Sequence, residues 1–372
     1  MEYNEAKLNE IIRSIEPANQ EAIKKAKERQ AKLAKPPGSL GGLEDISIRI
    51  AGITGSVNNS IEKKRLIVLS ADNGVVEEGV SSAPQSVTLA QTINLTKGIT
   101  GASALAKHFK DELVVVDMGV NTVINCPAVV DKKIAMGTKN LHKGPAMTRE
   151  QAIRGILIGI ELVEEAKKEG VDVIGVGEMG IGNTTTSSAI LTVLTGASVE
   201  DTTGKGGGLT DEGFLKKKRI IEEGIALNKP HKDDPVDVIA KVGGFDIAAM
   251  TGVFLGSAIS RVPVVIDGFI SVVAALCAAR LCPYVKDFLF PSHVSYEKGY
   301  MLAARELQLK PFLLLGMRLG EGSGCPIAFE ILSAACAVMN NMATFDEAGI
   351  NDDYLEGIRE GDKFTAKAGS AS

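Results

Sequence analysis

The sequence predicts an α/β fold with three layers, in which helices cover both faces of a mainly parallel β-sheet. Short runs rich in β-branched residues alternate along the chain with longer segments of helical periodicity. Strands that alternate with helices are joined by crossovers, and such crossovers place neighbouring strands parallel. A chain of 372 residues, 45% of them apolar, is long enough to bury the core that this architecture needs.

The N-terminal part of the chain predicts two amphipathic helices. Leu8, Ile11 and Ile15, and then Ile23 and Leu33, lie at helical intervals among many lysines and glutamates. The segment KPPGSLGGLE then ends this helical pattern. At the other end of the chain, the tail KFTAKAGSAS has small polar residues and nothing to bury, and we expect it to be mobile.

Six segments between these ends are predicted as strands. They read RLIVLSADNG, ELVVVDMG, VDVIGVGEMG, VPVVIDG, KDFLFPSH and PFLLLGMRLGEG. Each ends in polar residues, namely Asp72 and Asn73, Asp117, Glu178 with Asn183, Asp267, Ser292 with His293, and Glu321. Ligands of open parallel sheets bind beyond the carboxyl ends of the strands. We therefore expect these side chains to line a cleft.

Composition excludes several classes of partner. The net charge of −5, from 41 basic and 46 acidic residues spread along the chain, leaves no basic surface for nucleic acid. The N-terminus MEYNEAKLNEIIRSI lacks the apolar core of a signal peptide, and the most apolar stretch carries Asp267 and Arg280. We therefore expect a cytoplasmic protein with no nucleic-acid and no membrane partner.

No metal site or disulfide is predicted. The five cysteines are odd in number, form no C-x-x-C pair and lie mostly in apolar segments, so we expect them to be reduced and packed. The four histidines form no metal-binding cluster, although His293 follows a strand and is placed to line the cleft. A G-x-S-x-G nucleophile motif is also lacking.

The segment GVGEMGIGNTTT allows two interpretations. Gly175, Gly177 and Gly180 form a G-x-G-x-x-G motif between a strand and a helix, which is the fingerprint of dinucleotide-binding folds. The acidic residue that should hold the ribose is lacking, because Glu200 and Asp201 lie in a glycine-rich loop. We favour a cradle for a monophosphate over this fingerprint and over a tight turn without a ligand.

In that cradle, backbone N–H groups approach an anion. Gly180, Gly182 and Asn183 allow this approach, and Thr184 and Thr185 are predicted to cap the following helix.

A second glycine cluster, TGKGGG, does not match the P-loop that binds nucleoside triphosphates. Lys205 is followed by Gly206 where that motif needs serine or threonine. The helix that follows carries the lysine run KKK, which predicts a solvated face from which one lysine can turn inward.

The segment GMRLGEGSG places a single carboxylate between two glycines. Glu321 has no neighbouring side chain to pair with, and Gly320 and Gly322 clear space around it. Such an acid suits a general base that accepts a proton from a bound substrate. The alternative is an acid on a turn that faces water.

In these motifs the sequence resembles the nicotinate-nucleotide:dimethylbenzimidazole phosphoribosyltransferase family. The resemblance covers nearly the whole chain, through KPPGSLGGLE, ADNGVVEEGVSSAPQSVT, GEMGIGNTTT, TGKGGGL, VGGFDIAAMTG, VVIDGFI, PSHVSYEKG and GMRLGEGSG. Two departures touch the rim of the cleft. Asn73 stands where the family often has histidine, and TGKGGG stands where it often has TGRG or TGKGTG.

The resemblance implies a large α/β domain over residues 46-339 and a smaller helical domain that combines 1-45 with 340-372. It also implies a homodimer with active sites near the interface. From the residues themselves we expect no cofactor and no metal. The implied reaction moves phosphoribose from nicotinate mononucleotide to 5,6-dimethylbenzimidazole or a related base, with inversion at C1′. The products are α-ribazole 5′-phosphate and nicotinate, as in cobalamin biosynthesis.

The resemblance also implies roles for individual residues. Glu321 would be the base that removes the N–H proton of the attacking ring. The 5′-phosphate would be held by Gly180, Gly182, Asn183, Thr184, Gly204, Gly206, Ser292 and Ser295. The ribose would face Glu178 and Lys217. The incoming base would lie against Ser81, Ser82, Gln85, Met317 and Leu319.

Two other classes of protein stay open at this stage. A nicotinamide-dinucleotide-dependent oxidoreductase would use the glycine motif at 175-180. A non-catalytic module that senses nucleotides would need only the phosphate cradle. The sequence assigns no role to Arg318 and His293, and it leaves the physiological base open.

Overall fold

The computed structural model describes residues 2–355 and confirms the α/β prediction. Its six-stranded sheet is parallel throughout and has the order β3-β2-β1-β4-β5-β6. The strands are β1 (Lys64–Ala71), β2 (Glu112–Gly119), β3 (Val129–Asp131), β4 (Val173–Met179), β5 (Val264–Ile266) and β6 (Leu289–Pro291). The order reverses between β1 and β4, so the loops after these strands diverge and leave a crevice there.

The chain divides into two compact units. Of the described residues, the first unit holds the chain as far as Pro17 together with Lys63–Phe329, and the second holds Ala18–Glu62 and the chain from Glu330. The domain division implied by the resemblance, 1-45 with 340-372 against 46-339, stays a prediction. The tail that we expect to be mobile lies outside the described residues.

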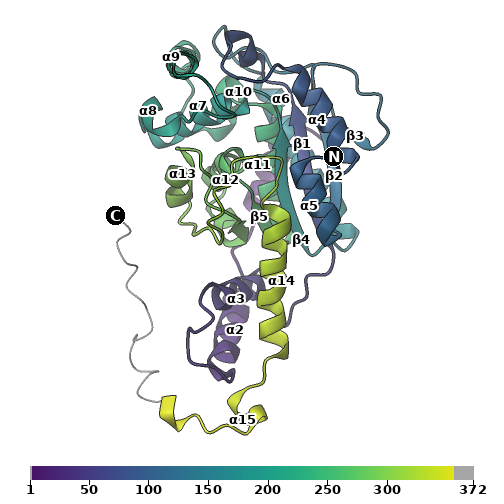
Figure 1. Ribbon diagram of the computed structural model, residues 1–372, viewed down its shortest axis with the longest axis vertical. Coiled ribbons are helices and arrows are strands. Elements are labelled where there is room, and N and C mark those ends of the chain that lie inside the picture. Colours follow the sequence, from purple (N-terminus) through teal and green to yellow (C-terminus); the bar gives the residue numbers. More distant parts are fainter. Residues whose placement is uncertain (1, 356–372) are drawn as a thin grey trace. The chain divides into compact units, whose positions relative to one another are not determined.

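Helices of the first unit cover both faces of the sheet (Figure 1). On one face, α11 (Phe245–Ser260) and α12 (Phe269–Leu281) contact the strands, and α6 (Arg149–Lys168) packs on α11. On the other face lie α4 (Ser86–Thr96) and α5 (Gly101–Phe109). The remaining helices are α1 (Glu5–Ser14), η1 (Gly74–Glu78), α7 (Asn183–Thr195), α8 (Val199–Thr202), α9 (Asp211–Asn228), α10 (Pro235–Val242), η2 (Pro283–Phe288), α13 (Tyr300–Glu306) and the first turns of α14 (Cys325–Asn341).

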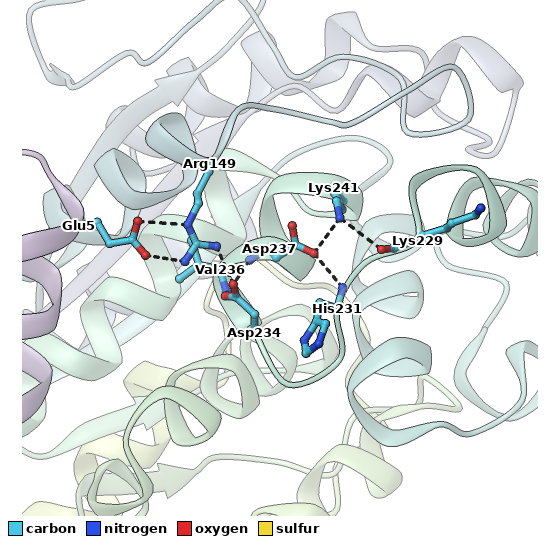
Figure 2. A network of polar contacts seen from close by, with 8 residues as sticks. All are labelled: Glu5, Arg149, Lys229, His231, Asp234, Val236, Asp237 and Lys241. Carbon is cyan, nitrogen blue, oxygen red and sulfur yellow. Dashed lines mark hydrogen bonds and ion pairs between the residues drawn. The ribbon is translucent and has the colours of Figure 1, made fainter.

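Polar contacts join α1 to α6 and α10 (Figure 2). Arg149, at the start of α6, contacts a carboxylate oxygen of Glu5 at 2.6 Å and one of Asp234 at 2.7 Å. Asp234 is also the N-cap of α10, and Asp237 in the next turn pairs with Lys241 at 3.0 Å. Exposed ion pairs contribute at most about 1 kcal/mol each. We therefore regard this network as a means of fixing the positions of three helices rather than as a main source of stability.

The second unit is helical. Its α2 (Gln20–Lys32) packs on α3 (Gly42–Thr54), where a Cβ on Gly52 would lie 2.6 Å from the side chain of Ile23. With α1 of the first unit, α2 confirms the two helices predicted near the N-terminus. The unit continues with the rest of α14, α15 (Phe345–Ala348) and η3 (Asp353–Leu355). None of the described helices is long and apolar enough to cross a membrane.

The sheet differs from the prediction at two places. The segment PFLLLGMRLGEG is not a strand: Leu313 alone forms an isolated bridge, and Leu314 and Leu315 are 82% and 59% exposed. Gly316, with a left-handed φ of 64°, interrupts the extended backbone that a strand needs. Conversely, β3 was not predicted, because only three residues of the segment CPAVVDKK pair with β2.

Candidate active site

A cavity of about 240 Å³ opens at the carboxyl ends of β4 and β5 and beside the loop after β6. Residues that follow these strands, among them Asp267 and His293, form its walls. The predicted site residues that line it are Ser81, Ser82, Glu178, Gly180, Gly182, Asn183, Thr184, Gly206, Ser295 and Leu319. The structure therefore brings together residues from segments far apart in the sequence, while their individual roles stay predictions.

A second cavity, of about 760 Å³, lies beyond η1 among the loops that follow β1, β2 and β3. Gln85, predicted to contact the incoming base, lines this cavity and not the first, and Asn73 lies in its wall. The remaining predicted site residues, which line neither of these two cavities, are Gly204, Lys217, Ser292, Met317 and Glu321.

Glu321 lies on a left-handed turn directly behind the wall of the first cavity. Gly320, Glu321 and Gly322 have φ angles of 87°, 63° and 84°. A side chain in this region costs about 1–2 kcal/mol. Glu321 as a whole is 3% exposed. Its Oε2 accepts a hydrogen bond from the N–H of Ala102 at 3.1 Å, and its own N–H donates to Oε1 of Glu178 at 3.3 Å. The alternative of a turn acid that faces water is therefore wrong.

Glycines of β4 make room for this turn. A Cβ on Gly177 would overlap the carbonyl oxygen of Glu321, and a Cβ on Gly175 would lie 2.5 Å from the Cβ of Cys325. Both glycines lie inside the strand, whereas a dinucleotide fingerprint places its first glycine in the turn after the strand. Packing thus explains the G-x-G-x-x-G pattern, and the sequence support for a dinucleotide site is lost.

Two buried carboxylates share the amide of Asn183. Its Nδ2 donates to Oε2 of Glu178 and, at 3.0 Å, to Oδ2 of Asp246. Glu178 is 7% exposed and Asp246 is completely buried. Uncompensated burial of a charge is costly, so these hydrogen bonds are what allow the two acids to occupy the interior.

Asp267 binds the backbone that follows Glu321. Its two carboxylate oxygens accept hydrogen bonds from the N–H groups of Gly322 at 3.1 Å and Gly324 at 2.7 Å. His293 places Nδ1 3.8 Å from the same carboxylate. Asp267 therefore fixes the backbone between the turn and the start of α14.

Burial raises the pKa of each of these acids. The pKa of Glu178 rises to about 8, that of Asp267 to about 7 and that of Asp246 to about 6. Negative neighbours add to the effect, because Asp246 and Asp267 act on Glu178, and Glu321 acts on Asp267. The hydrogen bonds described above act in the opposite direction. Such a cluster is suited to a ligand that carries or develops positive charge.

Lys217 is the member of the lysine run that turns inward. Its side chain is completely buried, and Nζ donates to Oγ1 of Thr184 at 2.8 Å and to the carbonyl of Gly204 at 3.2 Å. It thereby joins the first turn of α7 to the glycine loop. Burial lowers the pKa of Lys217 to about 8, and the charge of Glu297 opposes this shift.

The start of α7 corrects one prediction. Gly182, with a φ of 94°, is the N-cap and makes no side-chain capping bond. Because the helix begins at Asn183, Thr184 and Thr185 lie inside its first turn and cap nothing. The hydroxyl of Thr184 instead accepts the hydrogen bond from Lys217.

Sequence reasoning missed Ala102 and Asp246. The N-terminus of α5 reaches Glu321 across 219 positions, and no local pattern indicates that contact. Asp246 stands in the quoted segment VGGFDIAAMTG, but it follows no strand. His293 lines the first cavity, as its place after a strand predicted, and so does Arg318, for which nothing was predicted. Asp72 and Asp117 were expected to line the cleft, but they line neither of the two cavities and instead accept hydrogen bonds from backbone N–H groups.

Comparison with known proteins shows the class of this protein, an enzyme that transfers a phosphoribosyl group. The model of a family described as Phosphoribosyltransferase matches residues 15–350. The nicotinate-nucleotide–dimethylbenzimidazole phosphoribosyltransferase of Clostridium perfringens is 57% identical over 353 residues, which cover 95% of this chain and 98% of that protein. The protein of the same name from Clostridium tetani is 52% identical over 354 residues, with coverage of 95% and 98%.

A crystal structure shows the same fold. The nicotinate-nucleotide–dimethylbenzimidazole phosphoribosyltransferase of Thermus thermophilus aligns with a TM-score of 0.85 at 36% identity, covering 90% of this chain and 99% of that chain. The chain belongs to the nicotinate-nucleotide–dimethylbenzimidazole phosphoribosyltransferase family, and the resemblance in its motifs is confirmed.

The raised pKa of Glu178 predicts a pH-dependent stability. The folded chain binds this proton more tightly than the unfolded chain, whose glutamates have the ordinary pKa of 4.5, so the group lowers the free energy of unfolding as pH rises from about 4.5 to about 8. Glutamine cannot ionise. We expect the difference in Tm between Glu178→Gln and the parent to become more positive from pH 5 to pH 8, measured by thermal melting. The exposed Glu212→Gln is the control, and equal pH profiles for both variants would contradict the assignment.

Proposed function

We propose that the chain transfers the phosphoribosyl group of nicotinate mononucleotide to 5,6-dimethylbenzimidazole or a related base. The names of its relatives support this pair of substrates. A ring nitrogen of the base forms a bond to C1′ as the bond from C1′ to the pyridinium nitrogen breaks, and that electron pair leaves with nicotinate. Attack from the opposite face inverts C1′ and gives α-ribazole 5′-phosphate. In keeping with the sequence, we place the reaction in the cytoplasm.

The observation that carries the mechanism is the position of Glu321. Its carboxylate is buried behind the cavity wall, where the N–H of Ala102 and the turn at Gly320 fix its orientation. Nicotinate leaves as a neutral pyridine nitrogen, so its departure needs no acid. The attacking ring must lose its N–H proton, and Glu321 is the base that takes it.

The acids of the site complement the donor. Nicotinate mononucleotide carries a positive ring nitrogen, and positive charge develops on the ribose as the bond to that nitrogen breaks. Glu178 and Asp267 face the cavity from two strand ends. A cation bound there favours their ionised forms, so substrate binding and negative charge reinforce each other in a site that excludes most water.

The phosphate lies, in this proposal, between the first turn of α7 and the glycine loop. Gly182 and Gly206 have φ angles of 94° and 59° and expose their backbone to the cavity wall. Helix N-termini attract anions through their N–H groups and their dipole. Lys217 lies behind this loop and holds both parts together through Thr184 and Gly204.

Glu321→Gln tests the proposed base. Glutamine keeps an oxygen that accepts the N–H of Ala102, so we expect a folded variant that binds both substrates. The loss of a positioned general base should lower kcat by about 10²- to 10⁴-fold. The measurement is release of nicotinate at saturating substrates, with Glu212→Gln as the control. A variant that works at close to the parental rate would remove Glu321 from the mechanism, and a parent that binds the mononucleotide without releasing nicotinate would indicate a sensing module.

Lys217→Met tests the proposed phosphate site. Hydrogen bonds of charged groups contribute about 1.5–3 kcal/mol each, and without those of Lys217 the first turn of α7 is no longer held to the glycine loop of the proposed phosphate site. We therefore expect KM for nicotinate mononucleotide to rise about tenfold or more. Lys216→Met is the matched control, because it removes the neighbouring lysine from the exposed side of α9. Equal KM values for the two variants would place the phosphate elsewhere.

We also propose that the chain forms a homodimer whose interface borders the site. Leu314, Leu315 and Leu319 are 82%, 59% and 58% exposed, and Leu319 lies in the cavity wall. Adjacent apolar side chains of this size favour coverage by another surface, here a second copy. We expect sedimentation to give the mass of two chains for the parent and of one for the double variant Leu314→Glu, Leu315→Glu. A monomeric parent would contradict the proposal.

A further inference from the structure

We infer that Asp246 is a positioning residue for the transfer reaction. It orients the amide of Asn183, which holds Glu178 against the turn that carries Glu321. This role rests on the proposed function of Glu321 as the base. Asp246 itself lines neither described cavity and does not touch substrate in this scheme.

The surroundings of Asp246 are built for a carboxylate. The residue is completely buried in the first turn of α11, and its Oδ1 accepts a hydrogen bond from the N–H of Ile247 at 2.9 Å. A Cβ on Gly180 would lie 2.8 Å from Oδ2, and a Cβ on Gly244 would overlap Oδ1. Glycine at positions 180 and 244 and the burial of the Asp246 carboxyl each cost folding free energy. That the chain carries both indicates that Asp246 has a role beyond packing.

Asp246 determines which way the amide of Asn183 faces. An asparagine amide carries both of its N–H hydrogens on Nδ2, and in Asn183 this atom donates to two carboxylates. If the amide were reversed, its oxygen would face Oδ2 of Asp246, which with a pKa of about 6 is ionised at neutral pH and would repel it. The 3.0 Å bond to Asp246 therefore directs Nδ2 toward Glu178.

Glu178 in turn fixes the position of the turn that carries Glu321. Oε2 is held by Asn183, and Oε1 accepts the N–H of Glu321 at 3.3 Å. A Cβ on Gly320 would lie 2.5 Å from the same Oε1, so the turn rests directly on the carboxylate. Displacement of Glu178 therefore displaces the backbone of the proposed base.

A charge exchange between the two positions separates positioning from simple packing. Asp246→Asn removes the acid that orients Asn183, whereas the double variant Asp246→Asn, Asn183→Asp keeps one acid and one amide in contact. The exchanged pair retains its hydrogen bond, but position 183 now presents a carboxylate to Glu178 in place of the amide N–H. If Asp246 acts by positioning, the exchange does not restore turnover.

The experiment measures Tm, kcat and KM by thermal melting and by nicotinate release with 5,6-dimethylbenzimidazole. We expect Asp246→Asn to lower kcat by about 10- to 100-fold, the usual effect of displacing a reacting group by about 1 Å. The exchanged variant should keep the low kcat. Asp237→Asn is the matched control, because it changes an acid in the first turn of α10, away from the site, and should keep the parental kcat.

Two results would overturn the inference while leaving the proposed function intact. One is an Asp246→Asn variant with kcat within twofold of an active parent. The other is an exchanged variant whose kcat returns to the parental value together with its Tm. A parent that releases no nicotinate from the mononucleotide would instead overturn the proposed function, and the role of Asp246 with it.

Discussion

The site depends on one close approach between backbones, that of the turn at Gly320–Gly322 to strand β4. Because Gly177 has no side chain, the carbonyl of Glu321 comes to lie against the strand itself. The left-handed φ of Glu321 then directs its carboxylate toward the N–H of Ala102 at the start of α5. A residue with a Cβ at position 177 would move this turn, and the proposed base would lose its donor.

This approach has an electrostatic consequence. The turn closes over the carboxyl end of β4, where it buries Glu178 and brings Asp267 against the backbone of Gly322 and Gly324. Water that would stabilise negative charge is excluded, and the pKa of both acids rises. At neutral pH Glu178 therefore mostly keeps its proton, and a cationic ribosyl donor bound beside it would favour the ionised form.

The pattern of apolar residues predicted the strands that are buried on both faces of the sheet. Because these strands are parallel, the polar residues that follow them lie at the same edge of the sheet. The prediction failed for PFLLLGMRLGEG. An apolar run such as Leu313–Leu315 indicates burial, but the run itself does not indicate whether the same chain or another molecule covers it. The pattern missed β3, which has too few residues to show a period. The contact of Ala102 with Glu321 and the place of Asp246 depend on tertiary packing, which leaves no local pattern in a sequence.

The sequence of α9 contains a pattern, not used in the sequence analysis, that identifies which lysine of the run points inward. Lys217, Ile220, Ile221, Gly224 and Asn228 form the buried side of this helix. The spacing of three, four, seven and eleven positions from Lys217 is that of one helical face, so the two isoleucines alone mark Lys217 as the lysine that points inward. A lysine on an apolar face is unfavourable unless hydrogen bonds and charge compensate it. The position of Lys217 therefore required acceptors inside the fold, and Thr184 and Gly204 supply them beside the glycine loop.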